Sequence, residues 1–350
     1  MSTVPSTSGT HSGVPVLHYR APRWLPGGHA QTIWPALFSR AHGGSTPRYE
    51  RQRLLAPDGD FVDVDWLRTS QKNRSESGRR PLLVLFHGLE GGSGSHYALA
   101  FADYAARLGW DFAVPHFRGC SGEMNRAPRA YHSGDHAEVA WVIDALTAER
   151  QGPCYVVGVS LGGNALLRWT QEHAPTGMGT VKAVAAISAP LDLAASGAHI
   201  DRGFNRQVYV RNFLRTMQPR ALAKHRQYPN LFDIDAVMRA RTLREFDNAF
   251  TAPLHGFRDT EDYWHRASSI HALNRIRIPT LIINARNDPF VPAHSLPTAS
   301  QVSASVCLFQ PHHGGHVGFA AGPIPGHVGR LPELVGQWLQ HRSAPGVPHG

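Results

Sequence analysis

The sequence predicts an α/β fold: a mostly parallel sheet flanked by helices, with an inserted helical cap. Three observations support this prediction. From residue 81 onward, short apolar segments alternate with amphipathic helical ones, a pattern typical of parallel sheets covered on both faces. The apolar segment 154–159 runs into Gly158-Val-Ser-Leu-Gly162 and then into a helical segment. Between about 191 and 266 the alternation stops, and the chain becomes helical, polar and basic.

Length and composition suit one large domain with an insertion, because 350 residues that are 42% hydrophobic can bury a large core. We place this domain at 17–342 and its cap at about 191–266. Residues 1–16 are rich in Ser, Thr, Pro and Gly without an apolar stretch. We therefore expect a disordered tail there, and not a signal peptide. Residues 343–350 are expected to form a flexible tail.

The first part of the domain is expected to form an arm and a hairpin. Residues 19–35 are rich in Pro, Gly and aromatics and lack clean periodicity, which predicts an ordered arm packed on the domain. His29 in this arm is expected to be structural, although a functional role is the alternative. The segments 49–56 and 60–67 flank Pro57-Asp58-Gly59, and period-2 alternation around Asp-Gly is a hairpin signal.

The core of the sheet is predicted to follow a polar loop at 71–80. The expected strands are 81–88, 111–119, 154–159, 181–187, 278–284 and 305–309. The expected helices are 96–108, 135–150, about 161–173 and 331–341, with 207–217 and 233–246 in the cap. Asp135 is interpreted as an N-cap, and Gly109 as a helix end.

A serine nucleophile is predicted at Ser160. In a strand–turn–helix context, Gly-x-Ser-x-Gly places the serine on a tight, strained turn, where side chains two positions away would collide with neighbouring backbone. The same turn aims the backbone N–H of Leu161 and the N-terminus of the following helix at the reaction centre. The alternative is a glycine-rich turn whose serine only caps the helix.

An acid and a base follow later strands in the order typical of α/β-hydrolases. Asp288 comes after strand 278–284, and His316 comes after strand 305–309. Ligands and catalytic groups collect where parallel strands end, so we expect both side chains near Ser160. In triad logic His316 accepts the Ser160 proton, and Asp288 orients the imidazole.

Each of these assignments has an alternative. Asp288 precedes a proline and could only initiate a turn. His312 and His313 compete for the role of base, but the two glycines before His316 let its loop swing the ring over Ser160. The three histidines also suggest a metal site, which would leave the serine turn unexplained. We therefore expect neither a metal nor a cofactor.

The second oxyanion donor is expected in the loop 87–92, which follows the first core strand. Its glycines let the backbone approach a substrate, and the N–H of Leu89 is the predicted donor, paired with that of Leu161. His87 is expected to brace this loop by hydrogen bonds.

Net charge and cysteine content limit which partners and which cellular compartment we expect. The formal net charge is +9, but the basic residues are scattered and no aromatic-interleaved basic motif occurs, so we expect no nucleic-acid partner. Three cysteines, two of them in apolar strands, fit a reducing compartment. No apolar run approaches the roughly 20 residues of a membrane span. We therefore expect a cytoplasmic protein.

The cap adds an alternative, which is peripheral contact with the inner face of the membrane. It carries basic residues among apolar ones, which could hold anionic lipid near the site; the simpler interpretation is an ordinary solvated surface. The basic residues are Arg211, Arg215, Arg220, Lys224, Arg226, Arg239, Arg241 and Arg244.

Together these motifs resemble the YheT-like branch of the α/β-hydrolases, known as AB hydrolase family 4. The resemblance spans about 17–340. It rests on Gly27-Gly-His-Ala-Gln-Thr32, Asp58-Gly-Asp-Phe-Val-Asp-Val-Asp-Trp66, His87-Gly-Leu-Glu-Gly91, Phe117-Arg-Gly-Cys-Ser-Gly122, Gly158-Val-Ser-Leu-Gly-Gly-Asn164, Thr251-Ala-Pro-Leu-His-Gly-Phe257, Asn287-Asp-Pro-Phe290 and Gly314-Gly-His-Val-Gly-Phe319. The sequence departs from the family's Asp-Asp-Pro-Phe run at Asn287, which leaves the acid Asp288 in place.

The resemblance implies an esterase-type serine hydrolase with Ser160, Asp288 and His316 as its triad, acting on a small-molecule or lipid acyl ester. We therefore expect ester hydrolysis through an acyl-Ser160 intermediate. An acyltransferase, thioesterase or amidase would use the same groups, and a non-catalytic binding module on this fold is the more distant alternative. No motif specifies the acyl chain, the head group or the oligomeric state.

Overall fold

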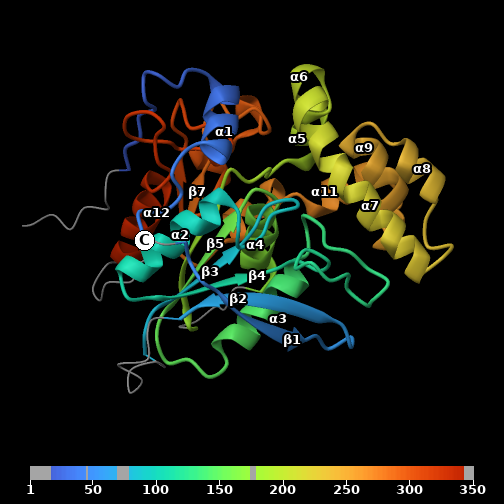
Figure 1. Cartoon of the computed structure of the whole chain (residues 1–350), viewed down its shortest axis with the longest axis horizontal. Coiled ribbons are helices and arrows are strands. Elements are labelled where there is room, and N and C mark those ends of the chain that lie inside the picture. The colour runs from blue at the N-terminus through green and yellow to red at the C-terminus, as the bar shows by residue number, and fades with distance from the viewer. Residues whose placement is uncertain (1–16, 45, 69–78, 174–178, 343–350) are drawn as a thin grey trace, which may run out of the picture.

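The computed structural model describes residues 17–44, 46–68, 79–173 and 179–342. Both expected tails and most of the predicted loop 71–80 lie outside these ranges. Eight strands form one sheet in the order β1-β2-β4-β3-β5-β6-β7-β8 (Figure 1). The strands are β1 Glu50–Leu55, β2 Phe61–Leu67, β3 Leu82–Phe86, β4 Asp111–Pro115, β5 Cys154–Val159, β6 Val181–Ile187, β7 Thr280–Ile283 and β8 Val306–Phe309.

The predicted hairpin and parallel sheet are both confirmed. Strand β1 pairs antiparallel with β2, and β2 pairs antiparallel with β4. From β4 to β8 every neighbouring pair is parallel. The C-terminal ends of β5, β7 and β8 therefore meet at one edge, where ligands bind in open α/β sheets.

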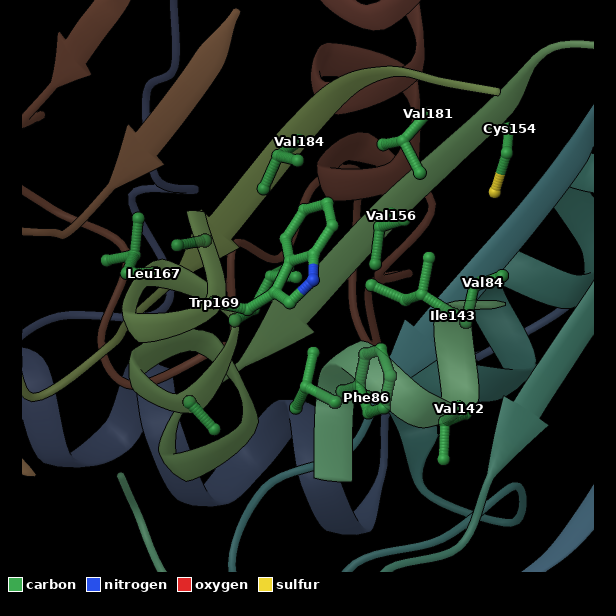
Figure 2. Close-up of a cluster of buried hydrophobic side chains, with 14 of the residues drawn as sticks. Val84, Phe86, Val142, Ile143, Cys154, Val156, Leu167, Trp169, Val181 and Val184 are labelled. Carbon is green, nitrogen blue, oxygen red and sulfur yellow. The ribbon is translucent and has the colours of Figure 1, made fainter. Parts of the chain in front are cut away.

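Helices cover both faces of the sheet. Helices α3 (His136–Thr147) and α4 (Leu161–Glu172) pack on one face, shown in Figure 2. Helices α2 (His96–Arg107) and α12 (Arg330–Arg342) pack on the other. Val84 belongs to the first core and Leu83 to the second, because successive side chains point to opposite faces. Burial on both sides explains why the strands are continuously apolar.

The segment predicted as the cap is helical and has a core of its own, which includes Val210, Leu214 and Phe250. Figure 1 shows its helices beyond the sheet edge, at the upper right. They are α5 Leu193–Ile200, α6 Gly203–Asn205, α7 Arg211–Gln227, α8 Ile234–Arg239, α9 Leu243–Phe246, α10 Ala252–Leu254 and α11 Thr260–Ala267, with π-helical turns at Arg206–Val210 and Asp247–Thr251.

Three predicted local features are corrected. The expected helix 233–246 is interrupted, because Ala240 is extended (ψ 135°) and the side-chain amide of Gln218 binds its carbonyl and those of two preceding residues. The expected helix 207–217 begins as a π-helical turn and continues in α7 to residue 227. Asp135 occupies the N-cap position of α3 without capping it, because its carboxylate binds Arg129 at 2.6 Å.

A fourth correction concerns the N-terminal arm, which contains a helix. Helix α1 spans Gly28–Leu37. Aperiodic composition hid it, since Gly27, Gly28 and Pro35 are poor helix formers. Within the described residues, no helix is both long and apolar enough to cross a membrane.

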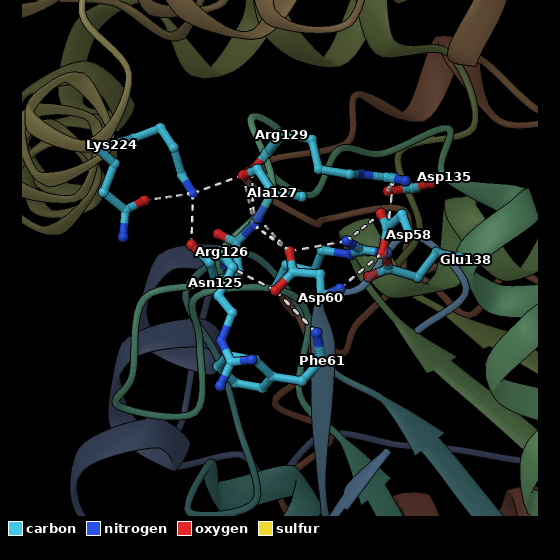
Figure 3. A network of polar contacts seen from close by, with 12 residues as sticks. Asp58, Asp60, Phe61, Asn125, Arg126, Ala127, Arg129, Asp135, Glu138 and Lys224 are labelled. Atoms are coloured by element: carbon cyan, nitrogen blue, oxygen red, sulfur yellow. Dashed lines mark hydrogen bonds and ion pairs between the residues drawn. The ribbon is translucent and has the colours of Figure 1, made fainter. Parts of the chain in front are cut away.

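A polar network joins the cap to the hairpin turn between β1 and β2 (Figure 3). Lys224 of α7 is buried, and its ammonium donates to the carbonyls of Asn125 and Ala127 at 2.7 and 2.9 Å. Asp60 accepts the side-chain N–H of Asn125 and the backbone N–H groups of Arg126 and Ala127. Burial lowers the pKa of Lys224 to about 8. The network fixes one end of α7 relative to the sheet.

Candidate active site

The turn after β5 holds Ser160 in a strained conformation. Its φ of 53° and ψ of −120° lie in a region that residues other than glycine rarely occupy. A side chain at Gly158 would meet the carbonyl of Gly162 at 2.5 Å, and one at Gly162 would collide with the carbonyl of His87. The glycines therefore let three backbone segments pack closely, as a nucleophile elbow requires.

The structure brings the three predicted catalytic side chains together. His316 Nε2 lies 3.0 Å from Ser160 Oγ, and His316 Nδ1 lies 2.8 Å from Asp288 Oδ2. When Nδ1–H donates to the carboxylate, the Nε2 lone pair faces the serine hydroxyl. Asp288 Oδ1 accepts the backbone N–H of Phe290 at 2.7 Å. The Phe290 ring stacks on the imidazole with a centroid distance of 4.0 Å.

The other two histidines of the predicted cluster do not reach the serine. His312 and His313 are exposed. His313 Nδ1 lies 3.5 Å from the Asn287 side-chain amide. Among residues 17–44, 46–68, 79–173 and 179–342, no three His, Cys, Asp or Glu side chains form a group that could hold a metal ion.

Helix α1 supplies supports that the sequence analysis missed. Thr32 Oγ1 accepts the backbone N–H of His316 at 2.9 Å and donates to the carbonyl of Gly28 at 2.7 Å. Gln31 Oε1 accepts the N–H of Gly314 and the side-chain amide of Asn287, both at 2.9 Å. The motif Gly27-Gly-His-Ala-Gln-Thr32 was the available sequence signal for this support. Its role could not be predicted, because the residues that it binds are remote in sequence.

Asn287, where the family pattern has aspartate, belongs to this support. Its amide N–H₂ donates to Gln31, and its Oδ1 accepts the N–H of Gly315 at 3.1 Å. A side chain at Gly28 would collide with the Asn287 carbonyl, and one at Gly318 with the Gln31 carbonyl. Helix α1 thus packs directly on both the acid loop and the histidine loop.

His87 makes hydrogen bonds that brace the loop after β3, as predicted. His87 Nδ1 donates to the carbonyl of Gly88 at 2.7 Å, and Nε2 accepts the N–H of Phe117 at 3.1 Å. Burial lowers the pKa of His87 to about 3, so the ring stays neutral with its proton on Nδ1. Leu89 of this loop and Leu161 of α4 line the same cavity as Ser160 and His316.

That cavity lies under the cap and measures about 740 Å³ with the open space at its mouth. Its lining is mostly apolar and includes Leu193, Ile200, Phe213, Met217, Leu243 and Trp264. Asp247, in the second π-helical turn, also faces it and accepts Thr251 Oγ–H and Trp264 Nε1–H at 2.6 and 2.9 Å. Burial raises the pKa of Asp247 to about 6.

A second cavity reaches the same serine from the solvent. It lies between α1 and the start of α7, is lined by Ser160, His316 and Leu89, and measures about 1130 Å³ with the open space at its mouth. His29 lies outside both cavities; its Nδ1 is 3.1 Å from Tyr209 Oη, and its ring contacts Phe204. These contacts support the expected structural role of His29.

Comparison with known proteins identifies relatives along most of the chain. The family described as alpha/beta hydrolase fold matches residues 81–323. The putative esterase YheT of Escherichia coli is 39% identical over 90% of this chain and 92% of its own length. The phospholipase ABHD3 of Bos taurus is 30% identical over 84% and 72%. The solved structure of Est1E from Butyrivibrio proteoclasticus with ferulic acid matches with a TM-score of 0.51, covering 84% of this chain and 98% of Est1E; at 14% identity this likeness concerns the fold alone.

Proposed function

The chain belongs to the α/β-hydrolase family as a YheT-like member, and on this premise we propose that it cleaves carboxylic acyl esters through an acyl-Ser160 intermediate. One observation carries the proposal: the continuous hydrogen-bonded path from Asp288 through His316 to Ser160 Oγ. The names of the two relatives, putative esterase and phospholipase, support the choice of an ester as the substrate class.

The first half of the reaction transfers the acyl group. His316 Nε2 accepts the hydroxyl proton as Ser160 Oγ attacks the ester carbonyl, and Asp288 stabilises the resulting imidazolium. The backbone N–H groups of Leu89 and Leu161 donate to the developing oxyanion. When the tetrahedral intermediate collapses, the C–O bond to the alcohol breaks. His316 gives its proton to the departing alkoxide, and an acyl-serine ester remains.

The second half repeats these steps with water. His316 accepts a proton from the water molecule, the resulting hydroxide attacks the acyl carbonyl, and the proton returns to Ser160 Oγ as the carboxylic acid leaves. The chain supplies every proton carrier in this cycle. The apolar cavity under the cap accommodates an aliphatic or aromatic group of the ester.

The test is hydrolysis of p-nitrophenyl esters, from acetate to palmitate, by the purified protein and by Ser160→Ala. We expect turnover that depends on the serine, with a chain-length optimum that measures the cavity. Ester hydrolysis that survives in pure Ser160→Ala would contradict the mechanism. Failure of a fluorophosphonate to label Ser160, together with no turnover of any ester, would favour a non-catalytic protein on this fold.

A further inference from the structure

The cavity between α1 and α7 opens beside apolar side chains that face solvent. Leu37 and Val208 line this cavity and are 67% and 37% exposed. Phe38, next to Leu37, is 57% exposed, and Phe204, whose ring contacts Tyr209 of the cavity wall, is 52% exposed. We call these four residues the mouth patch. Large apolar side chains gathered around the entrance to a cavity mark an interaction surface more often than isolated ones do.

Three arginines of the cap that have no acidic partner among the described residues lie close to Val208 of this patch in the sequence. Arg206 and Arg211 bracket Val208 in sequence, and Arg215 follows one helical turn after Arg211. All three are exposed, and none forms an ion pair with another described residue. The mouth therefore carries uncompensated positive charge next to apolar surface.

Three other basic residues of the cap are engaged elsewhere. Lys224 is buried and bound to carbonyls. Arg220 pairs with Glu90 at 3.3 Å, and Arg244 pairs with Glu261. The eight basic residues grouped by the sequence analysis are thus not one surface.

We propose that the mouth patch docks on an anionic lipid bilayer, with Arg206, Arg211 and Arg215 at the head groups and the apolar side chains inserted. Apolar side chains bordered by cations are the combination that binds such an interface, since each cation adds attraction to anionic head groups. Helices α1 and α6 lie at the same edge of the molecule in Figure 1, and the ring of His29 in α1 contacts that of Phe204 in α6. A docked mouth would open the path to Ser160 toward the lipid.

The charge in this proposal is tested by sedimentation of the full chain with vesicles, in the absence of any ester. Vesicles of phosphatidylcholine alone are compared with vesicles that also contain phosphatidylglycerol. We expect binding only to the anionic vesicles. Arg206→Glu combined with Arg211→Glu is expected to weaken it by about tenfold or more.

The matched control combines Arg226→Glu with Arg239→Glu, which changes the net charge equally. Both arginines are exposed on the cap, lie outside the cavity lining and lack an ion pair with a described residue. The control is expected to bind far better than the mouth variant. Equal losses in the two variants would overturn the proposal, because they would indicate a general effect of net charge.

The apolar part is tested with Leu37→Gln against Leu55→Gln, a control at a leucine of β1 that is similarly exposed (74%). Part of the vesicle binding is expected to persist at high salt. Leu37→Gln is expected to weaken this residual binding, and Leu55→Gln is not. Absence of binding to anionic vesicles at low salt would overturn the proposal. So would light scattering that shows a dimer broken by Leu37→Gln, since the patch would then be covered by a second copy of the chain. None of these readings depends on hydrolysis, so the proposed enzymatic activity can fail or stand separately.

Discussion

Ser160 Oγ and His316 Nε2 lie 3.0 Å apart, yet the turn of one residue and the loop of the other are held in place by different contacts. The serine turn is shaped by its own glycines and by the neighbouring strand ends, where added side chains would strike backbone. The histidine loop is held by side chains of α1, which are 283 and 284 residues away in sequence. One support is local and steric, and the other is remote and hydrogen-bonded.

Because of this difference, the candidate site extends beyond the segments that carry Ser160, Asp288 and His316. The family match begins at residue 81, so it includes the serine turn, the acid and the histidine but excludes α1. The geometry makes α1 part of the site, since Thr32 and Gln31 bind the backbone that carries His316. A fragment that begins at β3 would contain the reacting groups without the support of one of them.

The largest effect is expected from Asp288→Asn, which removes the charge of the carboxylate that binds His316. An amide in place of the carboxylate favours the wrong imidazole tautomer, and kcat should fall by about 10⁴-fold while KM changes little. Steady-state kinetics on a p-nitrophenyl ester measures this. A loss below about tenfold would indicate that Asp288 only shapes its turn.

A smaller effect, on stability, is expected on the serine side from Gly162→Ala. The added methyl group collides with the His87 carbonyl, and backbone cannot move aside cheaply. We expect the free energy of unfolding to fall by about 1–3 kcal/mol in urea titrations. Gly94→Ala is the control, since nothing lies within 4 Å of a side chain there. Equal stability of the two variants would show that the turn does not depend on its glycine.

The remote support is tested by Thr32→Val, which keeps the shape and removes the acceptor for the His316 N–H. We expect kcat to fall by about tenfold with KM nearly unchanged, because only the positioning of the base is lost. Thr32→Ser keeps the hydroxyl and should restore most of the rate. If Thr32→Val is as fast as the wild type while Thr32→Ser is slow, packing by the methyl group and not the hydrogen bond holds the loop.

The smallest effect is expected at Asp247, in the part of the cavity wall that the cap supplies, and it is a change of stability with pH. The pKa of Asp247 is raised by burial to about 6, so the folded protein binds more protons than the unfolded chain between about pH 4 and pH 6. The free energy of unfolding should therefore decrease as pH rises through this window, by on the order of 1 kcal/mol from this group. Asp247→Asn should flatten that part of the stability profile. An unchanged slope in the variant would assign the pH dependence to other groups.

The sheet and the meeting of Ser160, Asp288 and His316 could be predicted because their signals are local. Apolar runs determine the strands, and glycines next to Ser160 determine the turn. The order of strand ends brought Asp288 and His316 to the same edge. The predicted domain boundaries and the assignment of Leu89 and Leu161 as oxyanion donors stay predictions.

The missed features depend on contacts between distant segments. Helix α1 has unfavourable glycines and a proline, and it is stabilised by packing on the loops at 287 and 314–318. Asp135 was expected to cap its helix, but Arg129 offered a charged partner. Lys224 was expected at the surface. It is buried because its ammonium donates hydrogen bonds to two backbone carbonyls and to the side-chain oxygen of Gln227. No periodicity in the chain reports such partners.

The most direct test of the central claim is the mass of the intact protein after rapid acid quenching during turnover of a p-nitrophenyl ester, followed by peptide mapping. We expect one added acyl group on the peptide that carries Ser160, formed in the wild type and absent in Ser160→Ala. An ester hydrolysed at the same rate with no acyl group on Ser160, or with the group on another residue, would contradict it.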